Sequence, residues 1–250
     1  MSIENYGQTT VELDYVHGTG ALPTDRLDND SPDKATRALH AIAVATDGCI
    51  VKKGFDAISA TVNWVPFAPV EDRTLGRWSV DYASRYGAER SPDDGPAGVD
   101  LVKYGVDFNK AYANCQDAAK ESLRPELEFM QSRNMISEIR SRAFTLAVSS
   151  VAGQRAIAAW RKCSEDAGIV LDPRDGFPVE EYKAQGKEAE IKAYVTHARC
   201  ARSTSAIQEV FDLRARYELA LIDSQQAKIN TFENEQRKVM DVFDKVIAGG

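Results

Sequence analysis

Four cysteines, at positions 49, 115, 163 and 200, carry the most evident chemistry of this 250-residue chain. An even number of cysteines is what a disulfide framework requires, and four of them allow three pairings. The same residues could instead be buried thiols, because a free cysteine packs like a small hydrophobic side chain. A zinc site is disfavoured, since no two cysteines have the short C-x2-4-C spacing of zinc ligands. The count alone leaves disulfides and buried thiols open.

The three histidines, His17, His40 and His197, are too far apart in sequence to indicate a joint site. We find no H-E-x-x-H helix, G-x-S-x-G elbow, Walker loop or G-x-G-x-x-G turn, the motifs that assemble catalytic or cofactor-binding groups. Three aspartates in segment 25–30 lack the glycine and closing glutamate of a calcium loop. The sequence therefore predicts no catalytic residue, no metal site and no cofactor.

Five aromatic residues gather between the first two cysteines, in the least regular part of the chain: Trp64, Phe67, Trp78, Tyr82 and Tyr86. The simpler interpretation is that they form the core of the N-terminal half. Because tryptophan and tyrosine are enriched at binding hot spots, the same group is also our candidate binding surface.

The elements that position these residues are predicted to be mainly helical. The first 30 residues are rich in glycine, threonine, aspartate and asparagine without a sustained period, which favours a flexible N-terminal arm. Ser31 and Pro32 match the cap and first residue of a helix that Gly54 would end.

Between the first two cysteines the pattern becomes irregular. Loosely alternating apolar residues and two prolines favour an extended segment over 55–72. A short helix is predicted over 77–86, ending at Gly87, and the composition of 91–96 is that of a loop.

The second half of the chain is predicted to be helical from Asp107 onward. Pro125 can open a helix that runs to about residue 146, and residues 156–167 form another that stops at Gly168. Residues 205–247 contain no proline or glycine, and apolar residues recur at seven-residue steps. This pattern predicts one long helix or a helical hairpin.

The cysteines fall at similar places in these elements. Cys49 and Cys163 each lie in the last turns of a helix, five residues before a glycine, and Cys115 and Cys200 lie on later helices. We therefore predict two successive helical units, 31–122 and 123–250, after the arm of residues 1–30.

Three short motifs carry a resemblance to a known family. The run from Trp160 to Gly168, W-R-K-C-S-E-D-A-G, resembles the W-x-x-C-M-x-x-x-G signature of a family of actinobacterial secreted proteins and lipoproteins. Segment 188–201, an acidic helix leading to Cys200, is similar to the family's second signature. Cys49 to Phe55 resembles its C-M-x-x-x-G-F motif. Ile50 and Ser164 stand where the family usually has methionine.

The resemblance spans most of residues 22–247 and implies location and architecture. It implies an exported helical protein in which Cys49 pairs with Cys115 and Cys163 with Cys200. No activity is assigned to the family, and the lipobox cysteine of its lipoproteins is missing from this sequence. Met1 to Gly20 lacks the basic and apolar regions of a signal peptide, so we expect the export signal to be absent from this chain.

The net charge and the hydropathy of the chain exclude some classes of binding partner. A net charge of −7 argues against nucleic acid, which requires a basic face. No run of 18 apolar residues is present, so no transmembrane segment is predicted. We expect a protein or another envelope component as partner, and the sequence does not define the oligomeric state.

These observations predict a mainly α fold of two disulfide-stapled units with a long C-terminal helix and little β-structure. The expected function is that of a non-enzymatic extracytoplasmic binding or accessory protein of the cell envelope, secreted or lipid-anchored. The alternatives are an enzyme acting on the cell wall or a secreted substrate, and a structural subunit of a surface or secreted assembly.

Overall fold

The computed structural model describes residues 2–66, 70–90, 101–132 and 134–249. Over these residues the chain is mainly helical, and β-structure is limited to the pair of strands β1 (Leu13–Asp14) and β2 (Thr19–Gly20) and an isolated bridge between Leu171 and Pro178. The predicted mainly α fold is confirmed. None of the described helices is long and apolar enough to cross a membrane.

The chain divides into two compact units, each assembled from three segments. Unit 1 comprises residues 1–25, 69–93 and 137–225, and unit 2 comprises residues 26–68, 94–136 and 226–250. The sequence-based division into 1–30, 31–122 and 123–250 followed the chain consecutively, whereas these units are interleaved along it. The reason is that helices far apart in sequence pack together within each unit.

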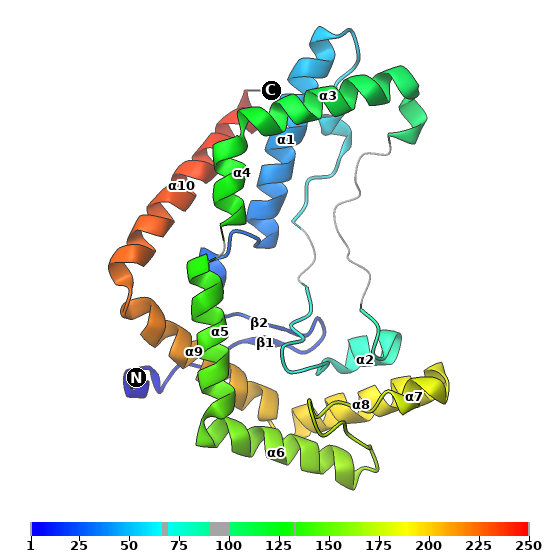
Figure 1. The fold of residues 1–250 in the computed structure, drawn as a ribbon, viewed down its shortest axis with the longest axis vertical. Coiled ribbons are helices and arrows are strands. Elements are labelled where there is room, and N and C mark those ends of the chain that lie inside the picture. Colours follow the sequence, from blue (N-terminus) through cyan, green and yellow to red (C-terminus); the bar gives the residue numbers. More distant parts are fainter. Residues whose placement is uncertain (1, 67–69, 91–100, 133, 250) are drawn as a thin grey trace. The chain divides into compact units, whose positions relative to one another are not determined.

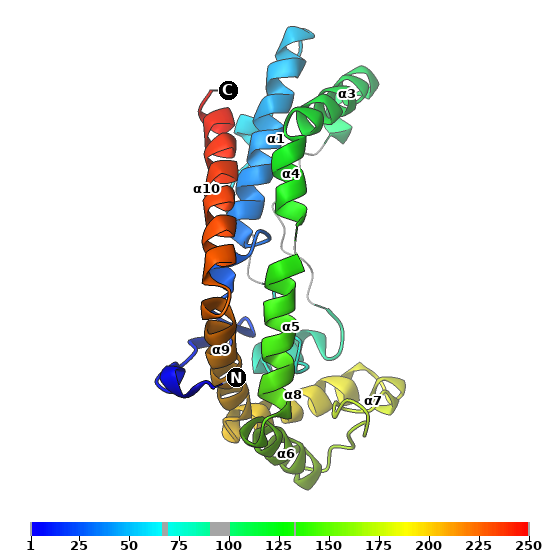
Figure 2. The ribbon, with the colours of Figure 1, turned by 60° about the vertical axis from the view of Figure 1, so that its left-hand side comes forward.

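Unit 2 is built on α1, which packs against α3 and α10 (Figures 1 and 2). Pro32 is the first residue of α1 and Ser31 precedes it, as predicted. Small and aliphatic residues of α1 meet Met240 and Phe243 of α10 in one core. The elements of the unit are α1 (Pro32–Lys52), η3 (Ser59–Thr61), η4 (Val102–Tyr104), α3 (Val106–Ser122), α4 (Arg124–Gln131) and α10 (Gln226–Ala248).

The Cys49–Cys115 disulfide joins the last turns of α1 to the middle of α3. Near this bond, the buried carboxylate of Asp47 accepts hydrogen bonds from the backbone N–H groups of Ile58 at 3.0 Å and Ser59 at 2.7 Å. This contact fixes the start of η3 against α1. The segment predicted as extended, 55–72, thus contains a 3-10 turn and, in its described residues, no strand.

Unit 1 has α9 at its centre, and Ile207, Val210 and Phe211 of this helix are almost completely buried. Helix α6 packs against α8 and α9, and α2 packs against α8. The Cys163–Cys200 disulfide joins α6 to α8. The helices of the unit are η1 (Glu4–Tyr6), α2 (Val80–Tyr86), α6 (Val151–Asp166), α7 (Glu181–Ala184), α8 (Lys187–Ser203), α9 (Ala206–Asp223) and most of α5 (Asn134–Ser149). The first residues of α5 are assigned to unit 2, and η2 (Asp25–Leu27) likewise contains residues of both units.

The N-terminal segment is packed rather than a flexible arm, which corrects the sequence-based prediction. Val11, Leu22 and Leu27 are buried, and the hairpin of β1 and β2 pairs Leu13 with Gly20. Apolar residues scattered among polar ones supply these contacts, so a composition rich in glycine and aspartate did not reveal them.

Two of the predicted helical segments each form two helices. The helix expected after Pro125 is divided into α4 and α5, and the segment 205–247 forms two consecutive helices, α9 and α10, separated at Ser224 and Gln225. The predicted loop 91–96 lies outside the described residues.

Both disulfides match the pairing that the family resemblance implied. Each unit contains one of them. Because disulfides form and persist in oxidising compartments, the two bonds point to folding outside the reducing cytosol.

Candidate functional site

The aromatic residues singled out in the sequence are divided between the two units and the part of the chain that the structure does not describe. Trp78, Tyr82 and Tyr86 belong to unit 1, Trp64 belongs to unit 2, and Phe67 lies outside the described residues. The candidate surface is therefore considered in unit 1, around α2.

Trp78 is a core residue, 1% exposed. Its ring makes edge contacts with Tyr15 and Phe211, both with ring centroids 5.6 Å away. Its indole Nε1 donates to the backbone carbonyl of Asp72 at 2.9 Å. A buried indole with its N–H satisfied anchors the segment before α2 and is not available to a ligand.

Trp64 stacks face to face on His40, with ring centroids 4.6 Å apart. Its indole Nε1 donates to the carbonyl of Ser59 at 2.9 Å, and partial burial lowers the pKa of His40. This pair holds the segment after η3 against α1 within unit 2.

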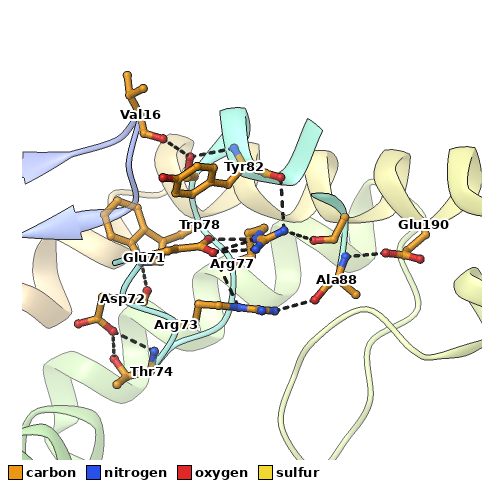
Figure 3. A network of polar contacts seen from close by, with 12 residues as sticks. Val16, Glu71, Asp72, Arg73, Thr74, Arg77, Trp78, Tyr82, Ala88 and Glu190 are labelled. Atoms are coloured by element: carbon orange, nitrogen blue, oxygen red, sulfur yellow. Dashed lines mark hydrogen bonds and ion pairs between the residues drawn. The ribbon is translucent and has the colours of Figure 1, made fainter. Parts of the chain in front are cut away.

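A buried ion pair between Arg77 and Glu71 lies beside α2 (Figure 3). Arg77 Nε donates to Glu71 Oε1 at 3.0 Å and Nη2 donates to Oε2 at 2.7 Å. Arg77 Nη1 donates to the backbone carbonyls of Tyr82 at 3.3 Å and Gly87 at 2.6 Å. The Arg77 guanidinium thus holds α2 at Tyr82 and the turn after it at Gly87. Lysine could not replace it, because its ammonium group lacks the rigid, planar set of five N–H donors.

The two ends of α2 are also held by side chains. Ser79 Oγ accepts from the Tyr82 N–H at 3.2 Å and donates to the carbonyl of Val16 at 2.8 Å. At the other end, Gly87 has a positive φ of 58° and Ala88 N–H donates to Glu190 Oε1 of α8 at 2.6 Å. The short helix is therefore rigidly placed, although seven residues would not be stable alone.

This frame presents Tyr82 and Tyr86 as half-buried neighbours on α2, with ring centroids 5.7 Å apart. The Arg77 guanidinium lies 5.8 Å from the centre of the Tyr86 ring, within cation–π range. Arg85 between them in sequence is exposed. Tyrosines with an adjacent arginine on a preorganised support have the composition of a protein-binding hot spot.

A second buried network ties the N-terminal segment to α9. Glu218 is completely buried and accepts hydrogen bonds from Thr24 Oγ1 at 2.8 Å and Arg214 Nε at 3.1 Å. Arg214 Nη1 also donates to Asp72 Oδ2 at 3.0 Å. Burial raises the pKa of Glu218, and Arg214 opposes that change. All these contacts join elements of unit 1 to one another, which favours a structural role.

Sequence reasoning missed the burial of His197. Its ring stacks on Trp160 with centroids 4.5 Å apart, and its Nδ1 lies 2.8 Å from Ser164 Oγ. Its Nε2 is buried without a hydrogen-bond partner among the described residues. Burial, aided by the positive charge of Arg161, lowers the pKa of His197 to about 4. The imidazole is therefore neutral at physiological pH.

The His197–Ser164 contact is a serine–histidine pair, but both side chains are fully enclosed in the core. Nucleophilic catalysis requires a substrate carbonyl beside the serine hydroxyl, and the Ser164 side chain is 0% exposed. The signal that could have located it is the disulfide itself, because His197 lies three residues before Cys200 and Ser164 directly follows Cys163.

Within the described ranges, no group of three histidine, cysteine, aspartate or glutamate side chains is placed to hold a metal ion. Comparison of the chain with protein-family models, with curated proteins and with solved structures found no match.

Proposed function

We propose that this protein is a non-enzymatic binding or accessory protein of the cell envelope that works outside the cytoplasm. In this proposal it is secreted or lipid-anchored and belongs to the actinobacterial family that its cysteine motifs resemble. One disulfide in each unit supports the compartment, since such bonds persist where the environment is oxidising.

The observation that carries the proposal is the rigid support under Tyr82 and Tyr86. The completely buried Arg77 holds α2 through two carbonyls and the Glu71 carboxylate. A partner that binds these tyrosines would meet side chains on a fixed backbone, so little conformational entropy is lost on binding. Such preorganisation serves recognition even where no reaction is catalysed.

The proposed partner is another protein of the envelope. Tyrosine and arginine are the side chains that most often dominate protein–protein binding energy. The chain's net charge of −7 disfavours an anionic polymer as the ligand of the molecule as a whole.

A binding assay on the native host tests the proposal. Labelled protein is titrated onto envelope fractions, with the variant Tyr82→Ala/Tyr86→Ala compared with Tyr104→Ala, a control at a half-buried tyrosine of unit 2. We expect saturable binding that weakens at least about tenfold in the double variant and is unchanged in the control.

If the double variant binds as tightly as the wild type, α2 is not the recognition surface. Steady release of soluble wall fragments by the purified protein would instead support the enzyme that we considered as the first alternative.

A further inference from the structure

Two segments of unit 2, the end of α1 and the start of α3 with η4 before it, carry exposed apolar side chains. Val51 in the last turn of α1 is 55% exposed, Val102 in η4 is 87% exposed and Val106 at the start of α3 is 82% exposed. Figure 1 shows the end of α1 and α3 in the same part of the unit. Single exposed valines are common on protein surfaces, so these three matter only together with their neighbours.

The turn after α1 brings the two segments together. Gly54 has a φ of 85°, and the Phe55 N–H donates to the carbonyl of Ile50 at 3.3 Å, as in a helix end that closes on glycine. After this turn the Phe55 ring makes an edge contact with Phe108 of α3, with ring centroids 5.4 Å apart. The disulfide of unit 2 joins the same two helices. The exposed valines therefore stand on backbone that side-chain packing and a covalent bond hold in place.

Lysines accompany the valines in both segments. Residues 49–58 and 101–112 contain four lysines and two aspartates, all of them exposed, in a chain whose net charge is −7. The lysines are Lys52, Lys53, Lys103 and Lys110, and the aspartates are Asp56 and Asp107. These two segments are therefore locally basic, although the molecule as a whole is acidic.

Projecting aliphatic side chains among lysines are typical of a membrane-surface contact. Aliphatic side chains enter the boundary between headgroups and acyl chains, and lysines are attracted to anionic headgroups. A lysine can also lay its methylene stem along apolar surface and keep its ammonium group in water. A protein partner would instead favour aromatic and arginine side chains that fill pockets. A side chain more than four fifths exposed projects from the surface and does not line a pocket, so shape and charge both favour a lipid surface.

We propose that this part of unit 2 binds the surface of a membrane that contains anionic lipids. Val102 and Val106 enter the headgroup region, and the lysines of both segments contact the lipid phosphates. Tyr104, between the two valines in sequence, is stacked on Phe108 and is not among the inserting side chains. The contact is peripheral and does not involve the tyrosine surface of α2 in unit 1, so it is independent of the proposed function.

Sedimentation of the full, unreduced chain with lipid vesicles tests the proposal. Vesicles of phosphatidylcholine alone are compared with vesicles that contain an equal part of phosphatidylglycerol, and neither kind holds a protein partner. We expect the chain to bind the anionic vesicles and to bind phosphatidylcholine much more weakly. Binding should fall as salt is raised from about 0.1 M to about 1 M, because the Debye length shortens from about 10 Å to about 3 Å.

Variants at exposed positions separate the apolar from the electrostatic contribution. Val102→Ser/Val106→Ser should weaken binding to anionic vesicles at least about tenfold, because it removes the inserting side chains without changing the charge. Val151→Ser is the matched control and should bind as the wild type does. Val151 is the first residue of α6, as Val106 is of α3, and is 85% exposed, but no lysine lies within five residues of it in the sequence. Lys52→Gln/Lys53→Gln should weaken binding by about fivefold for each lysine removed.

A wild-type chain that sediments with neither kind of vesicle would overturn the proposal. Equal binding of the wild type and the valine double variant would also overturn it, because the lipid would then be bound elsewhere. Binding to polyglutamate without binding to anionic vesicles would indicate an acidic protein as the occupant, which likewise contradicts the proposal. Tyr82→Ala/Tyr86→Ala should bind the vesicles as the wild type does, which keeps this result separate from the test of the proposed function.

Discussion

Acid should destabilise this protein through His197. The imidazole is buried against Trp160 and Phe177, and burial lowers its pKa from 6.5 to about 4 in the folded state. In the unfolded chain the same histidine takes up its proton near its ordinary pKa. His197 therefore binds a proton more weakly in the folded protein than in the unfolded chain.

The sign and size of the effect follow from this difference. Between the two pKa values the unfolded chain binds more protons, so the free energy of unfolding rises with pH. The stability that depends on a neutral His197 is fully present above pH 6.5 and is lost as the pH falls toward 4. The gap of 6.5 − 4 = 2.5 corresponds to about 3 kcal/mol at 1.36 kcal/mol for each pH unit.

Urea unfolding of the unreduced protein, followed by circular dichroism from pH 8 to pH 4.5, measures this loss. The variant His197→Phe keeps an aromatic ring beside Trp160 but cannot be protonated. Subtracting its unfolding free energy from that of the wild type removes the contributions of all other titrating groups. Between pH 8 and pH 4.5 we expect the wild type to lose more unfolding free energy than His197→Phe, by most of the predicted amount of about 3 kcal/mol.

Ser164→Ala serves as the matched control. It removes the hydrogen bond to His197 Nδ1 but leaves the imidazole buried. Since burial is the main cause of the lowered pKa, this variant should keep the acid sensitivity of the wild type. Parallel loss of stability in the wild type and in His197→Phe would refute the reasoning.

Three further perturbations act on contacts within one or the other unit. Arg77→Met leaves the buried Glu71 carboxylate with only the more distant Arg73 guanidinium, 3.9 Å away, and should cost about 3 kcal/mol in urea unfolding, with a smaller loss when Glu71→Gln is combined with it. Replacing Cys163 and Cys200 by serine releases a loop of 37 residues and should lower stability by about 4 kcal/mol, measured by calorimetry under non-reducing conditions that keep the Cys49–Cys115 bond. Asp47→Ala leaves two buried N–H groups without acceptors and should cost about 1–3 kcal/mol, seen as faster hydrogen exchange around η3.

Much of the helical architecture could be predicted from local signals. Proline at the start of α1 and the glycine after α2 mark positions where the backbone itself favours a helix start or stop. The interleaving of the units could not be predicted in this way. The interleaving depends on which apolar helix faces pack together, and α1 packs against α10, which lies at the opposite end of the sequence.

The candidate site was predicted only in part. The aromatic composition located the region of Tyr82 and Tyr86, but Arg77 and Glu71 are charged residues that sequence alone assigns to the surface. Their burial is possible because each satisfies the other, and such pairing is a tertiary property. Within the predicted arm, Thr9, Val11, Leu13 and Tyr15 are less exposed than the residues between them, a short alternation that the polar composition of the segment concealed.

The most direct test of the central claim is the state of the four cysteines in protein recovered from its native compartment. Free thiols are blocked at lysis, and the unreduced chain is digested and mapped by mass spectrometry. We predict Cys49 linked to Cys115, Cys163 linked to Cys200 and no blocked thiol. Four alkylated cysteines would contradict the extracytoplasmic, disulfide-stapled protein described above.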